Sequence, residues 1–312
     1  MSNGVYIGSG ETARKIAGIY VGVDGVARKV TKGYIGVSGL ARQFYAASVP
    51  FTYSYNGDCT ENEITIDGVA YTVLTITGSG TLTVNRAISV DVWLCGGGGN
   101  GRDAWISGLN GAAGGGGSGG YVTAAQLQLS GSVACAIGAA TGLTSFGALQ
   151  ANGGSNASAP NGGSGESGGG AARSILGSVG TPGAGTGKST TPTDFGQDSP
   201  HCAGGGGGGL YDANLDGGSI TQGGIGGSNG ENGGMASTAA NPYGGVGGEK
   251  GGGDGGDASH SGGGGTNGRN ATFYGSGGGG GSVWTLFSDS KGIGGSGYQG
   301  VIYIRWKKED AA

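Results

Sequence analysis

The sequence has few charged residues, few prolines and no long hydrophobic run, and each shortage excludes a class of protein. Charged residues make up 12% of the 312 residues and the net charge is −4, whereas disordered chains are usually highly charged. Only six prolines occur and glycine follows no strict triplet rule along the chain, which excludes a collagen triple helix. Because no run of about 18 apolar residues exists, we expect no membrane span.

Histidine and cysteine are also too few for the usual catalytic or zinc centres. The two histidines, His201 and His260, are far apart in the sequence, and the four cysteines lack the C-x-x-C spacing of a metal or redox motif. We interpret His201 and Cys202 as a turn before Gly204, and we expect free thiols in a protein that folds in a cytosol. The first ten residues lack an apolar segment, so no secretory signal is expected.

Two motifs come close to known sites without matching them. Residues 182–189 resemble a phosphate-binding loop, but proline replaces the first glycine and Pro192 interrupts the helix that should follow. Asp212, Asn214 and Asp216 match the first half of a calcium loop, although the glutamate expected at its end is missing. These three residues remain a weak cation-site candidate, and we predict no cofactor and no enzymatic activity.

What the chain has instead is glycine. Most of its 84 glycines lie in residues 96–299, where no ordinary core can form because glycine has no side chain to bury. In stretches such as 224–233 and 294–300, glycine recurs at every third residue, which is the period of an extended left-handed helix without internal hydrogen bonds. Such helices must pair through backbone groups of their neighbours. The spacing predicts a bundle of polyglycine II helices, with a flexible linker as the alternative.

Residues 1–47 contain three copies of a 14-residue repeat. Each copy begins with a tyrosine and ends near an arginine, and the three pairs are Tyr6 with Arg14, Tyr20 with Arg28, and Tyr34 with Arg42. Each copy reads as two short strands joined by a turn. A hairpin this short cannot bury its own apolar face, so we expect the copies to stack on each other or on another chain. One arginine per copy is sparse for phosphate contacts, which favours a protein partner over nucleic acid.

Conventional β sequence flanks the glycine region on both sides. Between residues 48 and 95 we expect four or five antiparallel strands, including 51–55, 69–77, 81–84 and 87–94. Two more strand-like pieces, 121–129 and 132–137, lie inside the glycine region.

The end of the chain returns to β sequence at residues 300–306, before a charged tail at 307–312. Pairing of this last strand with residues 90–94 would make a β base from which the bundle over 96–299 projects. The predicted fold class is therefore mainly β with a polyglycine II helix bundle and no significant α-helix.

Several segments carry a resemblance to a known family: Ser89–Gly101, Gly114–Val122, Thr144–Gly147 with Ala151–Gly154, and Gly294–Trp306. They resemble the entry strand, inner motifs and closing strand of the glycine-rich domain of bacteriophage tail fibres and related virion proteins. The 14-residue repeat resembles the leader on fibre proteins of phages of Gram-positive gut bacteria. The resemblance implies a virion fibre or adhesin that is assembled in the bacterial cytoplasm, acts outside the cell, and attaches to another virion protein through its leader.

The interruptions between glycine runs carry aromatic residues, which suit contact with a surface glycan or a receptor protein. The same residues could instead plug the ends of the bundle. The candidates are Trp105, Tyr211, Tyr243, Phe273, Tyr274 and Trp284. Two functions follow: an attachment protein that displays these residues to a bacterial surface, or a purely structural fibre, decoration or filament subunit. In either case a homotrimer or a filament would close the open edges of the hairpins.

Overall fold

The computed structural model divides the chain into two compact units, Met1–Phe51 with Ala312, and Thr52–Ala311. It describes residues 6–9, 12–15, 19–23, 26–37, 40–46, 49–105, 111–158, 161–172, 181, 183–185, 189–208, 210–211, 251–255, 265–284 and 291–308. The elements in these ranges are strands, apart from one 3₁₀ turn, η1 (Thr193–Phe195), which confirms a mainly β chain without significant α-helix. Within these ranges no helix has the length and apolar character needed to cross a membrane.

Each 14-residue repeat forms a separate antiparallel hairpin, as the sequence predicts. The first hairpin pairs Tyr6 with Lys15, the second pairs Tyr20 with Lys29, and the third pairs Tyr34 with Gln43. The three two-stranded sheets do not join into a larger one. The strands are β1 (Tyr6–Ser9), β2 (Thr12–Lys15), β3 (Tyr20–Val23), β4 (Val26–Lys29), β5 (Lys32–Val37) and β6 (Leu40–Ala46).

The middle hairpin exposes an apolar face. Every residue of β3 and β4 is exposed, and Val21, Val23 and Val26 are 50%, 40% and 58% exposed. Val23 lies opposite Val26, and Val21 lies opposite Arg28, so these four residues share one face. Because a lone hairpin is marginally stable in water, this face needs a cover that the described part of a single chain does not supply.

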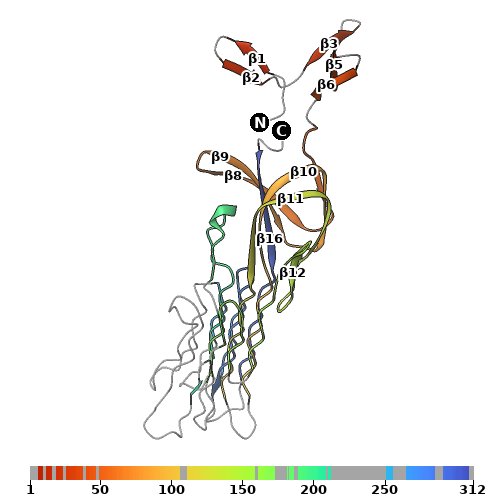
Figure 1. The fold of residues 1–312 in the computed structure, drawn as a ribbon. Coiled ribbons are helices and arrows are strands. Elements are labelled where there is room, and N and C mark those ends of the chain that lie inside the picture. Colours follow the sequence, from red (N-terminus) through yellow and green to blue (C-terminus); the bar gives the residue numbers. More distant parts are fainter. Residues whose placement is uncertain are drawn as a thin grey trace. The chain divides into compact units, whose positions relative to one another are not determined.

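Eight strands of the second unit form one antiparallel sheet (Figure 1). Their order is β13-β12-β11-β10-β16-β9-β8, and β7 also pairs with β10. The strands are β7 (Tyr53–Tyr55), β8 (Cys59–Ile66), β9 (Val69–Ile76), β10 (Gly80–Cys95), β11 (Tyr121–Ala136), β12 (Thr144–Phe146), β13 (Leu149–Ala151) and β16 (Val301–Lys307). The last strand, β16, lies between β9 and β10 and pairs residues 301–305 with 91–95, which confirms the predicted closure.

The strands differ from the sequence-based expectation in length. Strand β10 runs through both pieces predicted at 81–84 and 87–94, and β11 likewise joins two predicted pieces. A register shift between Val84 and Ile88 absorbs the irregularity, and Gly131 of β11, opposite Val84, has a positive φ of 69°. Such a bulge bends a strand without ending it. Strand β8 lies outside the ranges named from the sequence, because its polar sequence lacks a clear apolar alternation.

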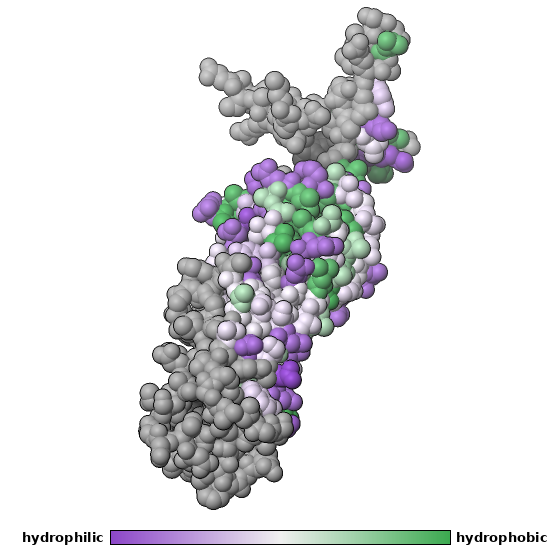
Figure 2. Space-filling model, turned by 60° about the horizontal axis from the view of Figure 1, so that its bottom comes forward, coloured by the Kyte–Doolittle hydropathy of each residue, from purple (hydrophilic) through white to green (hydrophobic). Residues whose placement is uncertain are grey.

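The sheet has an aliphatic core and, beside it, an aromatic cluster. Leu74, Ile76, Leu94, Ile302 and Ile304 are each fully buried on the central strands. The aromatic cluster joins the sheet to the segment around η1, and it contains Trp93, Cys95, Phe195, Cys202 and Tyr303. Figure 2 shows hydrophobic residues gathered over the sheet, whereas the described glycine segments give a mostly pale, nearly neutral surface.

The glycine segments run side by side from the sheet as long extended rows (Figure 1). Two antiparallel rows, 276–282 and 292–298, show the predicted period of three in their hydrogen bonds. The N–H groups of Gly292, Gly295 and Tyr298 donate to the carbonyls of Ser282, Gly279 and Ser276, at 2.8, 2.7 and 2.9 Å. This part of the chain is therefore ordered by backbone hydrogen bonds between rows, and the flexible-linker alternative does not hold for it.

An inner row shows how many neighbours one glycine segment has. Successive N–H groups of residues 115–117 donate to three different segments, and the acceptors are the carbonyls of Gly170, Gly278 and Ser155. A β-strand would direct alternate groups to two neighbours only. A row with three residues per turn directs them to three, which is the arrangement that glycine permits because no Cβ separates the backbones.

Side-chain oxygens complete the hydrogen bonds of rows at the edge of the bundle. In the 292–298 row, two N–H groups donate to Asn267 and Asn270, each at 2.8 Å, and two donate to Asp103 and Asn100, each at 2.9 Å. Both acceptor pairs are spaced by three residues. The asparagine and aspartate residues among the glycines therefore have a structural role, because they replace a missing neighbouring row.

Candidate ligand-binding groove

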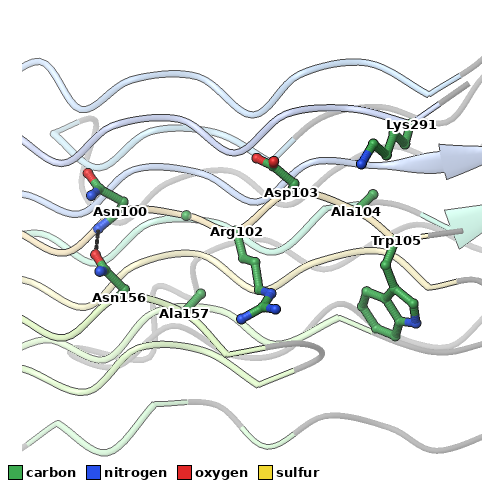
Figure 3. Close-up of a pocket in the computed structure, with 9 residues that line it drawn as sticks. Asn100, Arg102, Asp103, Ala104, Trp105, Asn156, Ala157 and Lys291 are labelled. Carbon is green, nitrogen blue, oxygen red and sulfur yellow. Dashed lines mark hydrogen bonds between the residues drawn. The ribbon is translucent and has the colours of Figure 1, made fainter. Parts of the chain in front are cut away.

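A polar groove with one aromatic wall lies along the outside of the glycine rows (Figure 3). Its volume is about 480 Å³. It is lined by residues 100–105, which follow the first glycine run, by Asn156 and Ala157, and by Lys291. The groove contains Trp105, one of the residues that the sequence marks as a receptor-contact candidate.

The three-residue period decides which side chains face the groove together. Arg102 and Trp105 are three residues apart and extend to the same side of their row, whereas Asn100 and Asp103 extend from other sides (Figure 3). Ala104 lies between them with its side chain 1% exposed, inside the bundle. A row of this kind therefore presents a guanidinium and an indole side by side without any helix or sheet.

The polar floor of the groove is held in place by hydrogen bonds to backbone groups. The Asn100 N–H donates to Asn156 Oδ1 at 2.7 Å, and the Asn100 side chain in turn accepts from the Gly297 N–H at 2.9 Å. Asp103 Oδ1 accepts from the Gly294 N–H at 2.9 Å. One carboxylate oxygen of Asp103 is thus already occupied by the adjacent row.

Trp105 is fixed by its contact with Gly111. The two residues exchange both backbone hydrogen bonds, each at 3.1 Å. A Cβ atom added at Gly111 would come within 3.0 Å of the Trp105 ring, so the indole lies directly against this glycine. The ring remains partly exposed on its other side. Gly111 is therefore a position where close approach requires glycine.

Two exposed cationic side chains line the groove, together with the carboxylate of Asp103. Arg102 and Lys291 are both exposed, and neither forms an ion pair with another residue in the described ranges. Guanidinium, ammonium and amide groups donate hydrogen bonds to hydroxyl or anionic oxygens, and an indole face packs against the apolar face of a sugar ring. The arrangement therefore suits the binding of a polar or anionic ligand.

The other predicted contact residues are placed differently. Tyr274 is half-buried and packs on Tyr298 and His201, with ring centroids 5.4 and 5.6 Å apart, against the aromatic cluster. Phe273 is partly buried and lies close to Gly251. The backbones of Tyr211 and Trp284 pair in the short parallel strands β14 (Leu210–Tyr211) and β15 (Val283–Trp284).

Some predicted residues lie outside the described part of the chain. These are Tyr243 and the three candidate cation ligands Asp212, Asn214 and Asp216. In the part that the structure describes, no group of three or more His, Cys, Asp or Glu residues could hold a metal ion.

The interpretation of His201 and Cys202 as a turn did not predict that both residues are buried. His201 is 2% exposed, and its ring nitrogens lie 2.8 Å from the Ser199 carbonyl and 2.8 Å from the Tyr303 hydroxyl. Its ring also meets Trp93 edge-on at 5.4 Å. Local sequence could not show this, since Trp93 and Tyr303 are distant along the chain.

Burial of His201 predicts an acid-sensitive fold. Burial lowers the pKa of His201, and the Ser199 carbonyl offsets this only in part. Below the ordinary histidine pKa of about 6.5, the unfolded chain takes up a proton that the folded protein excludes. Stability should therefore be complete above that pH and should fall towards the lowered pKa, by at most about 1.4 kcal/mol per pH unit.

Thermal denaturation at a series of pH values from about 7.5 to about 5.5 measures this effect. His201→Gln, which keeps a hydrogen-bonding side chain but does not titrate, should flatten the dependence. An unchanged slope in that variant would assign the acid sensitivity to other groups.

Comparison with known proteins places most of the second unit in one family. The family model described as a glycine-rich domain matches residues 75–307, from strand β9 to the last residue of β16. No curated protein matches the chain. Because this model spans strands β10 to β16 with the glycine rows and the groove, and covers most of the sequence, the chain belongs to the glycine-rich domain family.

Proposed function

We propose that this chain is a bacteriophage virion fibre protein, a tail fibre or adhesin, whose glycine-rich domain presents the groove at Arg102 and Trp105 to a host surface. The observation that carries the proposal is that this groove is built on a hydrogen-bonded glycine row. A binding site on such a row is held rigidly, which lowers the entropic cost of binding. The resemblance of the motifs to phage fibre proteins supports the same conclusion.

The rows themselves suit a fibre. We infer that they are polyglycine II helices, because their hydrogen bonds repeat every three residues and reach three neighbouring segments. Their backbone groups are paired between rows, so little backbone is open to a protease. Such a bundle needs no apolar core, and it can carry polar or aromatic residues along its outer rows.

The ligand that best fits the groove is a bacterial surface glycan. Trp105 offers a ring face, Arg102 and Lys291 offer free cationic donors, and the lining asparagines add amides. A receptor protein with an exposed polar loop could bind to the same side chains of the groove. No nucleic acid is proposed as a partner, because the chain has a net charge of −4.

In this proposal the leader, residues 1–47, attaches the chain to another protein. The exposed valines of the middle hairpin, Val21, Val23 and Val26, form an apolar face with Arg28 beside it. We propose that this face is covered by another virion protein or by further copies of the same chain in a homotrimer or a filament. The protein would then assemble in the bacterial cytoplasm and act outside the cell as part of the virion.

Binding to host material tests the attachment function. The purified full-length protein should bind whole cells of some Gram-positive gut bacteria and the wall polysaccharide extracted from them. Trp105→Ala should weaken this binding at least about tenfold, because stacked aromatic residues are typical hot spots. Ile293→Ala is the matched control, since Ile293 is 56% exposed on a nearby glycine row but does not line the groove.

Two results would count against the groove as the receptor site. Equal loss of binding in both variants would indicate a general surface effect, and full binding by Trp105→Ala would move recognition elsewhere. If the wild-type oligomer binds none of the cells or polysaccharides, the attachment function itself fails.

A structural fibre subunit without a receptor is the second candidate. The uncovered face of the middle hairpin favours it, because this face predicts self-association even without a ligand. Electron microscopy of the purified protein separates the two functions. Short trimeric spikes would support an attachment fibre, whereas long filaments formed without host material would support a structural one.

A further inference from the structure

Two buried cysteines meet where the sheet joins the glycine rows. Cys95 and Cys202 are each 0% exposed. A Cβ atom added at Gly275 would lie 2.9 Å from Cys202 Sγ and 3.1 Å from Cys95 Sγ, so both sulfurs border the same small space. Both residues also belong to the same buried cluster, with Trp93 and Tyr303.

The backbones on both sides of this contact are firmly held. Cys95 is the last residue of β10 and pairs with Tyr121 on one side and Val301 on the other. The Cys202 N–H donates to the Tyr274 carbonyl at 3.0 Å, and Cys202 has a positive φ of 59°, which is unusual for a residue other than glycine. The two thiols are therefore held together by the fold and do not meet by chance motion.

We propose that Cys95 and Cys202 form a disulfide when the folded protein meets a small two-electron oxidant. The bond would join the end of the central strand to the row 201–208, and so connect the sheet covalently to the glycine bundle. Cys59 and Cys135 lie elsewhere in the sheet region, in β8 and β11, and are not part of this pair. The proposal is independent of any receptor or virion partner.

With hydrogen peroxide as the oxidant, the reaction balances in two steps. One thiolate attacks a peroxide oxygen and becomes a sulfenic acid, with release of hydroxide. The second thiolate then attacks that sulfur and displaces its hydroxide, which forms the S–S bond. Overall, two thiols lose two protons and two electrons, and one hydrogen peroxide becomes two waters.

The environment makes this reaction slow but specific. Hydrogen bonding with Cys95, together with burial, raises the pKa of the Cys202 thiol well above its usual range. The thiolate is the reactive form, so oxidation should speed up as the pH rises. A bulky reagent should react poorly with the pair, because both thiols are buried. Once one sulfur is oxidised, the second thiol is already beside it, so the disulfide should form in preference to other products.

Mass spectrometry of the oxidised protein tests the bond directly. The native full-length protein is treated with hydrogen peroxide, its remaining thiols are alkylated, and it is digested without reduction. The expected product is a cross-linked peptide pair that contains Cys95 and Cys202. Because the bond closes a loop of roughly a hundred residues, the oxidised protein should also melt about 5–10 °C higher than the reduced protein.

Cys202→Ser keeps a hydrogen-bonding group at the same place but cannot form the bond. This variant should lose the cross-link and the oxidant-dependent rise in melting temperature, while Cys135→Ser should keep both. The proposal is overturned if both cysteines of the wild type are recovered as free thiols or as sulfinic acids, or if either is linked to Cys59 or Cys135 instead.

Discussion

Replacing Gly119 by alanine should unfold much of the glycine bundle, whereas the same change at Gly120, the next residue, should leave it intact. A Cβ atom at Gly119 would fall within 3.0 Å of the Gly96 carbonyl oxygen, on a neighbouring row whose backbone cannot yield. At Gly120 the nearest atom would be the Asn152 carbonyl oxygen at 3.7 Å, which is an ordinary contact. One methyl group should therefore have opposite outcomes at adjacent positions.

The size of the effect follows from how the row is held. The Gly119 N–H donates to the Gly275 carbonyl at 2.7 Å, so moving the row to accommodate a methyl group also breaks this bond. We expect Gly119→Ala to lower the free energy of unfolding by about 3 kcal/mol or more, and Gly120→Ala to change it by less than about 0.5 kcal/mol. Urea denaturation followed by circular dichroism measures both. Similar stability of the two variants would contradict close packing of these rows.

Truncating Trp93 should have the largest effect within the sheet. The side chain is 3% exposed and meets the rings of Tyr303 at 5.6 Å and His201 at 5.4 Å. Trp93→Ala would leave a cavity in the aromatic cluster that joins the sheet to the segment around η1. Cavities of this kind cost about 3–5 kcal/mol of unfolding free energy. The expected result is a much lower urea midpoint with the cooperativity of unfolding retained.

Tyr121→Ala is the control for this prediction. Tyr121 stacks on the same indole, with centroids 6.0 Å apart, but it is 38% exposed at the edge of the cluster. Its loss leaves a space that water can fill, so we expect a cost of only about 1 kcal/mol. If both variants lose the same stability, the aromatic cluster does not join the two parts as described.

The sequence predicts the elements of this fold better than it predicts their neighbours. Alternating apolar residues predicted the strands, and the apolar character of residues 301–306 predicted their return to the sheet. The glycine period predicted the three-residue repeat of the hydrogen bonds between rows. These features are local, so they can be recognised in a single stretch of sequence.

The groove could be predicted only in part. Trp105 was found because an aromatic residue between glycine runs is conspicuous. Its neighbours Ala157 and Lys291 were not, because they come from rows far along the chain. Glycine carries no side chain that would specify which rows lie side by side, so the order of the rows is not readable from the glycines themselves.

The same limit explains why the sequence did not predict the burial of the thiols and of the histidine. His201 and Cys202 stand next to a glycine run and read locally as a turn. They are inside the protein because Tyr303 and the end of β10 pack against them, and both of these are distant in the sequence. Buried residues of this kind can be recognised only from the three-dimensional arrangement, because the composition of the chain does not indicate them.

The asparagine and aspartate acceptors at the edge of the bundle have a consequence for how such a chain can change during evolution. Asn100 with Asp103, and Asn267 with Asn270, meet the 292–298 row because the two residues of each pair are three positions apart, which is one full turn of the polyglycine II helix that we infer. Inserting or deleting three residues in a glycine run would return every later side chain to its former direction. Inserting one residue would turn all of them by a third of a circle, towards the wrong neighbours. Rows of this family should therefore lengthen and shorten by whole triplets.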